Sequence, residues 1–146
     1  MPDTAIDLPD WQTLQRALPG LTAKLDAYRQ TFLQLEQIPP LTLVLCRCRM
    51  AQLHGLEAVS QDDLQAGVAQ DKLANLGQWP SHDAFSDDER AALAFTEVYT
   101  MDPSAITDAH ADAVKAAYGE AGLVALIHAL GLFYAEIRTR LIWKTP

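Results

Sequence analysis

Apolar residues recur along this chain at spacings of three and four, which is the period of an α-helix. No clear run of alternating apolar and polar residues, the pattern of a half-buried strand, interrupts them. The clearest helical stripe consists of Leu21, Leu25, Tyr28, Phe32 and Leu35. Such a stripe must face a partner helix. The pattern therefore predicts an all-α fold.

Residues that start or stop helices divide the chain into segments. In the clearest start signal, the Ser86 hydroxyl can accept from the amide of Glu89 while the Glu89 side chain reaches back. Gly55 is placed to cap the C-terminus of the third helix, and Pro19-Gly20 to separate the first two. The resulting bundle has about six to eight helices. We expect helices at about residues 10–18, 21–35, 41–54, 68–76, 90–101, 107–118 and 119–143.

The chain of 146 residues is sized for a single domain, with residues 1–9 expected to be flexible and residues 20–143 forming the helical core. The third helix is apolar on most sides, so we expect it in the middle of the bundle, with Arg47 and Arg49 reaching an edge or an interface. The uncharged run Ala121 to Ala135 is shorter than the roughly 18 residues of a membrane span. It is expected to be a buried core helix.

The formal net charge of -8 and the pI near 4.7 exclude two classes of partner. A nucleic-acid backbone and an anionic membrane surface both require a basic face. Small molecules and other protein subunits remain. The first ten residues lack the basic and apolar regions of a signal peptide, so we expect a cytoplasmic protein.

Cys46 and Cys48 lie one residue apart in an apolar helical stretch. Two positions along a helix point to nearly opposite sides, so these thiols cannot easily bridge each other. We expect them to be small buried hydrophobic residues rather than a redox pair.

The stretch Arg-Met-Ala-Gln-Leu-His-Gly-Leu-Glu-Ala-Val, residues 49–59, resembles the segment that leads into the Cys-x-x-Cys-x-x-x-His motif of the carboxymuconolactone decarboxylase and alkylhydroperoxidase D family. The block from Asp71 through Ser-Asp-Asp-Glu-Arg-Ala-Ala-Leu, residues 86–93, is similar to that family's following loop and helix. The resemblance covers most of the chain from about Leu21. It implies an alkylhydroperoxidase D-like helical bundle that assembles as a homo-oligomer, a dimer, trimer or hexamer.

In active members of that family, two cysteines, a histidine and a glutamate form a proton relay. Position by position, the resemblance places Leu56 and Val59 where the cysteines would be, Asp63 where the histidine would be, and Val44 near the place of the glutamate. An aliphatic side chain cannot ionise, attack a peroxide or close a disulfide. The chain is therefore expected to fold like the family and to lack its thiol chemistry.

Other residues can support a different chemistry. His54, Arg49 and Glu57 are close in sequence at a helix end, where they could form a general acid/base and anion-binding cluster, although a histidine before a capping glycine often only satisfies carbonyls. His128 lies in the apolar last helix with Leu132 and Ala135 on about the same face, so it needs a buried partner or a cavity. The candidate catalytic residues are His54, His128 and Glu57, and the candidate substrate-binding residues are Arg49 and Arg138.

Glu136, Arg138 and Arg140 near the C-terminus are either a solvated helix end or, in an oligomer, interface ion pairs. The sequence has no His-x-x-x-His or Glu-x-x-His spacing, so neither a metal site nor another cofactor is expected.

Three functions are consistent with these residues. The first is a cofactor-free, thiol-independent enzyme of the decarboxylase-like branch that acts on a small carboxylate or lactone by acid/base chemistry. The second is a non-catalytic, oligomeric ligand-binding member of the family. The third is a thiol peroxidase that uses Cys46 or Cys48, which requires an exposed and acidic thiol.

Overall fold

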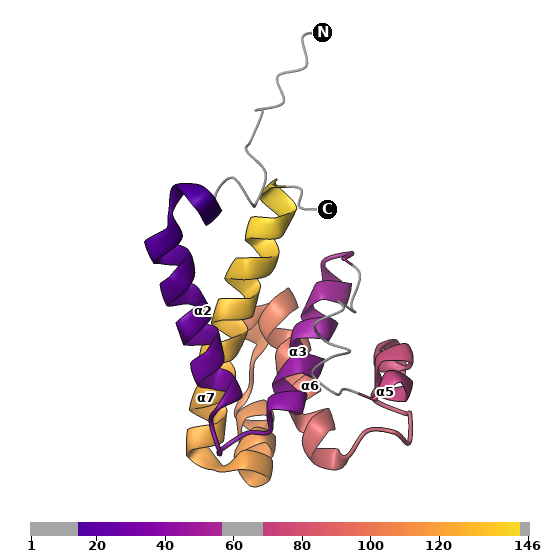
Figure 1. Ribbon diagram of the computed structural model, residues 1–146. Coiled ribbons are helices and arrows are strands. Elements are labelled where there is room, and N and C mark those ends of the chain that lie inside the picture. The colour runs from indigo at the N-terminus through magenta and orange to yellow at the C-terminus, as the bar shows by residue number, and fades with distance from the viewer. Residues whose placement is uncertain (1–14, 57–68, 144–146) are drawn as a thin grey trace, which may run out of the picture.

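The computed structural model describes residues 15–56 and 69–143, and over these ranges every regular element is helical (Figure 1). The all-α prediction is therefore confirmed. Residues 1–9, which were expected to be flexible, lie outside the described residues. The first parts of the helices predicted at 10–18 and 68–76 also lie outside them. Of the first of these helices, residues 15–17 are described and are helical. The elements are α2 (Pro19–Leu33), α3 (Pro40–Leu53), α5 (Gln70–Ala74), η1 (Leu76–Gln78), α6 (Asp87–Met101), η2 (Pro103–Ala105) and α7 (Asp108–Trp143).

Pro19 and Gly20 belong to α2, so the prediction that they separate two helices was wrong in detail. Pro19 is the first residue of the helix, where the amide that proline lacks would have no helical partner in any case. The helix then ends at Leu33, two residues before the end of the predicted stripe.

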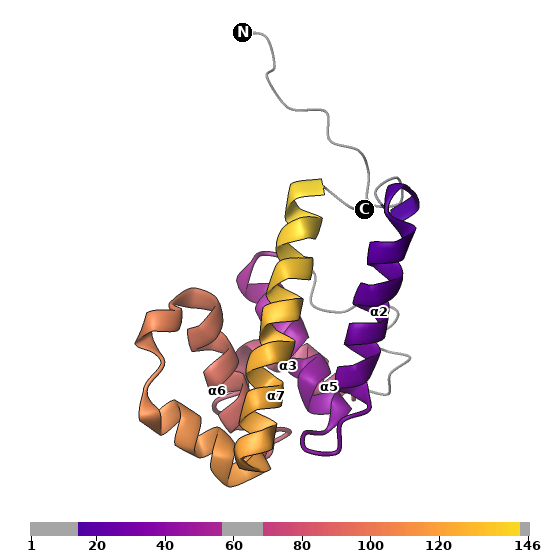
Figure 2. The same cartoon turned by 90° about the vertical axis from the view of Figure 1, so that its left-hand side faces the viewer.

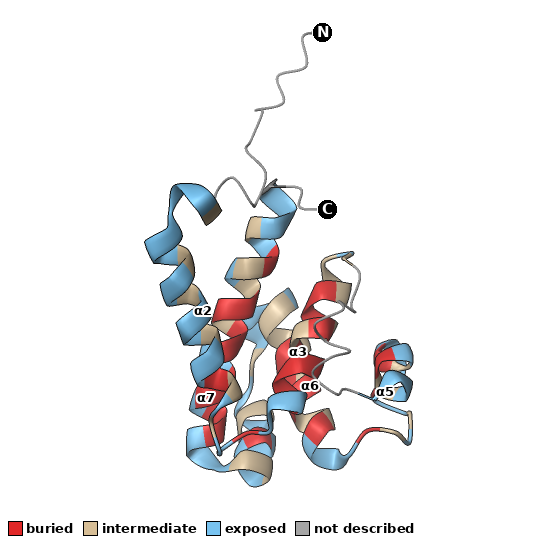
Figure 3. Cartoon of the chain, in the orientation of Figure 1, coloured by how far each residue is buried: buried red, intermediate tan, exposed pale blue. Residues whose placement is uncertain are grey.

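α3 lies at the centre of the fold, as predicted, and packs against both α6 and α7 (Figures 1 and 3). It begins at Pro40 and is buried along most of its length, while Arg47 and Arg49 are half-buried at its edges. Its buried residues are Thr42, Leu43, Val44, Leu45, Cys46, Cys48, Met50 and Ala51. Because the helix is covered on nearly all sides, its position determines where the surrounding helices pack.

α6 begins with the predicted capping box, in which Ser86 Oγ accepts from Glu89 N at 3.1 Å and Glu89 Oε1 accepts from Ser86 N at 2.9 Å. Lys72 of α5 also donates to both Glu89 carboxylate oxygens at 2.7 Å. Burial raises the pKa of Glu89, but the hydrogen bonds from Lys72 and Ser86 outweigh it and lower the pKa overall. The same carboxylate thus caps α6 and joins it to α5.

α7 consists of two helical segments that meet at Gly119, which confirms the predicted boundary. Gly119 has φ 75° and ψ 176°, a backbone conformation that is accessible almost only to glycine. The chain therefore changes direction at this residue. The second segment then runs between α2 and α3 (Figure 1).

α2 is attached to the rest of the molecule mainly through one side, which faces α7 (Figures 1 and 2). Of the predicted apolar stripe, only Phe32 is buried, Leu25 and Leu35 are half-buried, and Leu21 and Tyr28 are exposed. The stripe was predicted to face a partner helix, and in the structure that helix is mainly α7, but the contact is incomplete (Figure 3). Open space therefore remains along the line of contact between α2 and the second segment of α7, which is called the α2–α7 seam below.

α7 is only partly a buried core helix. An 18-residue window within Asp108–Ile142 has a mean hydropathy of 1.5, and 44% of that window is buried inside the protein. By length and composition this helix could cross a membrane, but a core helix passes the same test, so the finding is weak evidence. Val124, Ile127 and His128 of this helix face outward.

Replacing Gly119 by Ala should destabilise the protein by about 1–3 kcal/mol, because an L-residue is strained in this conformation even though no atom lies within 4 Å of an added Cβ. Urea unfolding followed by circular dichroism measures the loss. Gly20→Ala is the control, since Gly20 also has open space and lacks a positive φ; it should leave stability unchanged or slightly raised. Equal stability of the two variants would show that Gly119 is not strained.

Candidate functional site

His54 caps α3 at the point where the chain turns. Leu56 N donates to Ala51 O and Gly55 N donates to Gln52 O, both at 3.0 Å, while Gly55 has φ 75°. This pair of bonds and the left-handed glycine form a Schellman motif, so the predicted role of Gly55 is confirmed. The His54 Nδ1 lies 2.8 Å from Met50 O. Because a carbonyl only accepts, Nδ1 carries the proton of this hydrogen bond, and Nε2 is the ring nitrogen that it leaves unused.

The His54 ring packs edge-on against Tyr134 of α7, with 5.4 Å between the ring centroids. Arg138 lies over the same tyrosine ring, 4.6 Å from its centroid, and donates to its hydroxyl group. Tyr99 of α6 packs edge-on against Tyr134 from another side, at 6.2 Å. Thus two predicted site residues, His54 and Arg138, share one tyrosine. The spacing of four between Tyr134 and Arg138 could have indicated their pairing, whereas no local pattern points to the contact with His54.

Arg49 is directed away from this cluster and into the contact between α3 and α6. Its Nε donates to Glu97 Oε1 at 2.7 Å, and its Nη1 donates to Gln52 Oε1 at 3.0 Å. Trp79 Nε1 donates to the same Glu97 oxygen at 2.7 Å. The guanidinium is therefore already paired with a carboxylate inside the chain, which leaves it little capacity to anchor a substrate anion.

His128 is exposed, and of the two surroundings expected for it, a buried partner or a cavity, it has the second. Its Nδ1 lies 2.9 Å from Val124 O, one helical turn earlier, which satisfies the ring without a partner from another helix. Leu132 is buried, but Ala135 is exposed as well. The helix is apolar on more sides than its neighbours cover, so apolar composition alone did not locate the buried side.

His128 lines an open groove with a volume of about 510 Å³ between α2 and α7. Aromatic and aliphatic side chains from both helices form most of its wall. The full lining is Tyr28, Thr31, Phe32, Leu35, Gln37, Ala121, Val124, Ala125 and His128. The stripe on α2 revealed one wall of this groove in the sequence, but not that the wall is left partly open.

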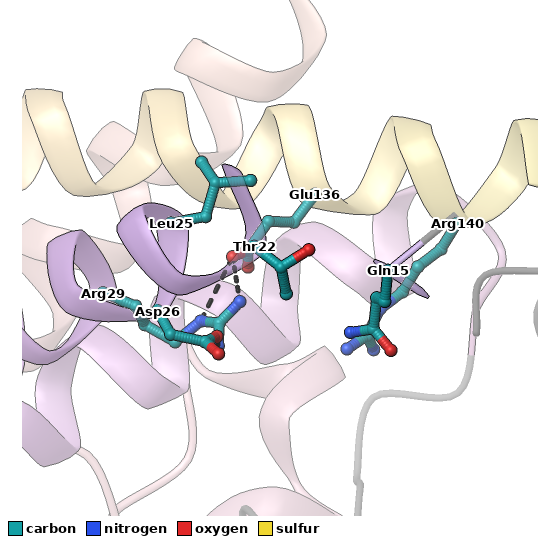
Figure 4. A pocket seen from close by; sticks show the side chains of 7 residues that line it. All are labelled: Gln15, Thr22, Leu25, Asp26, Arg29, Glu136 and Arg140. Carbon is teal, nitrogen blue, oxygen red and sulfur yellow. Dashed lines mark hydrogen bonds and ion pairs between the residues drawn. The ribbon is translucent and has the colours of Figure 1, made fainter. Parts of the chain in front are cut away.

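A smaller pocket of about 110 Å³ lies along the same seam, toward the start of α2 and the end of α7 (Figure 4). It contains Glu136 and Arg140, two of the three charged residues that were expected to form a solvated helix end or interface ion pairs. Glu136 instead pairs with Arg29 of α2 within the same chain. The lining residues are Gln15, Thr22, Leu25, Asp26, Arg29, Glu136 and Arg140.

Both cysteines are buried, with 0% of each residue exposed. Burial raises the pKa of Cys46 to about 12, although a hydrogen bond with Thr96 acts in the opposite direction. Burial also raises the pKa of Cys48, and the positive charge of Arg47 opposes this only in part. A thiol in this setting is protonated at neutral pH and has no access to a substrate. The surroundings match the prediction of small buried residues.

The sequence-predicted site residues that the structure describes are distributed over different parts of the fold. Of those that the structure describes, only His128 lines either of the two cavities along the α2–α7 seam. Leu56 is half-buried against the core, and Val44 is buried. Glu57, Val59 and Asp63 lie outside the described residues. Within residues 15–56 and 69–143, no group of three His, Cys, Asp or Glu side chains is placed to hold a metal ion.

The sequence matches no protein-family model, and a search of curated proteins finds no match.

Neither cysteine should react with 5,5′-dithiobis(2-nitrobenzoic acid) at pH 8 in the folded protein, and both should react in guanidinium chloride, because the thiols are buried and protonated. Absorbance of the released thionitrobenzoate counts the reactive thiols. Ala109→Cys, at an exposed position of α7, supplies a thiol that should react promptly in the folded state. Rapid modification of Cys46 or Cys48 without denaturant would contradict the burial.

The ion pair between Arg49 and Glu97 should stabilise the fold. Arg49→Met and Glu97→Gln should each cost about 1–3 kcal/mol, since each leaves a half-buried group without its charged partner. The double variant should lose less than the sum of the two, with a coupling energy of about 1 kcal/mol. The same urea-unfolding cycle on Arg90 and Asp87, where the carboxylate is almost fully exposed, should show coupling close to zero. Additive effects at Arg49 and Glu97 would show that the pair contributes nothing.

Proposed function

We propose that this protein binds a small, largely apolar molecule in the groove between α2 and α7, as a member of the carboxymuconolactone decarboxylase and alkylhydroperoxidase D-like family that does not use thiol chemistry. One observation carries the proposal: an open groove of about 510 Å³ has a mainly apolar wall and a histidine at its edge. Ligand sites typically combine an apolar wall with a few polar groups in this way.

The size of the groove favours a small molecule over a protein partner. Sites for small molecules typically have volumes of about 300–1,000 Å³, and this groove falls within that range. Only nine residues line it, whereas each side of a standard protein interface contributes about 20–30 residues. A second protein chain would need a much larger surface than the groove offers.

The wall also indicates the chemistry of the ligand. Phe32, Leu35 and Val124 can contact an apolar body. His128 has its Nδ1 occupied by Val124 O, so Nε2 is the ring nitrogen left for a ligand. Among residues 15–56 and 69–143, no lysine or arginine lines the groove. The ligand class that fits is therefore neutral, with an apolar body and one or two hydrogen-bonding groups.

The positions of the candidate residues favour ligand binding over the two catalytic hypotheses. Acid/base chemistry on a carboxylate needs a proton-transfer group beside a cationic group that holds the carboxylate. The two candidate anion-binding residues do not line the groove with His128. Arg49 is paired with Glu97, and Arg138 lies on Tyr134. Peroxide reduction needs a reactive thiol, but Cys46 and Cys48 are buried and have raised pKa values. Ligand binding in the groove requires neither an anion-binding arginine nor a reactive thiol.

Titration with N-phenyl-1-naphthylamine, a neutral apolar dye that fluoresces in apolar surroundings, tests the groove. The wild type should bind it with a stoichiometry of one and a dissociation constant in the micromolar range. Val124→Arg should weaken binding at least about tenfold, because it places a charged side chain in the apolar wall. Val124 is 55% exposed, so this change should leave the fold intact.

Ile127→Arg is the matched control, since Ile127 is 39% exposed on the same helix and does not line the groove. It should bind the dye within about twofold of the wild type. Absence of dye binding by the wild type, or equal losses in the two variants, would reject the proposal. Sedimentation velocity of the same proteins addresses self-association: if only Val124→Arg dissociates an oligomer, the groove is an interface between copies and the proposal fails.

A further inference from the structure

The smaller pocket at the other end of the α2–α7 seam is lined by charged side chains of both signs. Arg29 and Arg140 line it together with two carboxylates, Asp26 and Glu136. Figure 4 shows the Arg29 side chain turned toward the carboxylates and the Arg140 side chain beside the amide of Gln15. The chain as a whole carries a formal charge of -8. The described lining of the pocket, with two arginines and two carboxylates, therefore has a formal charge of zero, whereas the chain as a whole is strongly acidic.

Both carboxylates are held by Arg29. Its Nη1 donates to Asp26 Oδ1 at 2.9 Å, and its Nε donates to Glu136 Oε1 at 3.1 Å, with a further bond from Nη2 to the same Glu136 oxygen. Arg140 has no carboxylate within ion-pair distance among residues 15–56 and 69–143. A guanidinium has five N–H donors in a planar fork, which suits an oxyanion. The Arg140 charge is thus left for a ligand.

Arg47 of α3 adds a third positive charge to this region. Burial lowers the pKa of Arg47, and the charges of Arg140 and Arg29 lower it further, while Cys48 and Glu136 act in the opposite direction. The three arginines therefore influence one another electrostatically. An anion near Arg140 would relieve part of this repulsion.

We propose that this pocket binds a compact oxyanion, such as inorganic phosphate or the phosphate end of a small metabolite, with Arg140 as its main ligand. The Gln15 amide and the remaining Arg29 N–H groups line the same space and can supply further hydrogen bonds. The volume of about 110 Å³ is that of roughly three or four water molecules. It accommodates a tetrahedral anion but is well below the roughly 300 Å³ of a typical site for a larger ligand.

This anion site is separate from the proposed ligand groove, because the two cavities share no lining residue. The occupants also differ in chemistry, since the groove contains no arginine and the small pocket contains two. Either proposal can therefore fail without the other.

Thermal unfolding of the full chain in sodium phosphate, against sodium chloride at matched ionic strength, tests the proposal. A ligand that binds only the folded state raises the unfolding midpoint with a saturable dependence on its concentration. The wild type should show this dependence in phosphate at millimolar concentrations. Arg140→Gln should weaken the apparent affinity at least about tenfold, because it removes the guanidinium that has no carboxylate partner among the described residues.

Arg138→Gln is the matched control, because it makes the same change in charge on the same helix at an exposed arginine that lies on Tyr134. It should stay within about twofold of the wild type. Glu136→Gln should tighten phosphate binding at least about threefold by removing the carboxylate that competes for Arg29. The proposal is overturned if phosphate has no saturable effect on the unfolding midpoint of the wild type. It is also overturned if Arg138→Gln and Arg140→Gln lose apparent affinity for phosphate equally, or if Glu136→Gln weakens phosphate binding.

Discussion

The burial of α3 is the constraint on which the rest of the structure depends. This helix carries apolar residues on almost all sides, and eight of its fourteen residues are buried. Each large aliphatic side chain removed from water contributes about 1.5–3 kcal/mol before the cost of ordering the chain. A helix of this kind must be covered from several directions, and α6 and α7 provide most of that cover. Its position also buries both cysteines and leaves its arginines at the edges.

Partly buried charged groups then fix how the surrounding elements are attached. Glu97 accepts hydrogen bonds from both Arg49 and Trp79, which joins α6 to α3 and to the residue that follows η1. Glu89 joins α6 to α5 through Lys72. In each case one carboxylate satisfies donors from two separate segments, so the penalty for removing it from water is offset by several hydrogen bonds. The α3–α6 part of the fold is consequently closed.

The α2–α7 seam is organised differently. α2 has only one buried residue, Phe32, and its main charged link to α7 is the pair between Arg29 and Glu136. Incomplete packing leaves space on the seam, and the composition of the two helices divides that space into an apolar groove and a charged pocket. The candidate sites therefore lie along the α2–α7 seam, where the packing between helices is incomplete. The tyrosine cluster around His54 lies on other faces of α3 and α7.

The sequence by itself determined the all-helical class and most helix boundaries, because these depend on nearest neighbours along the chain. The Ser86 capping box, the Gly55 cap and the break at Gly119 each involve residues within about one turn of one another. The burial of the cysteines was also predictable, since the whole helix around them is apolar.

Only the tertiary structure decided which side chains meet. Arg29 and Glu136 are 107 residues apart in sequence, and Arg49 and Glu97 are 48 apart, so no periodic pattern specifies either pair. The exposure of His128 likewise depends on how far α2 covers an α7 that is apolar on several sides. Helix faces are set by local periodicity, but the crossing of two helices is set by the packing of all their neighbours. The two cavities, and the position of Arg140 in the smaller one, are products of that crossing.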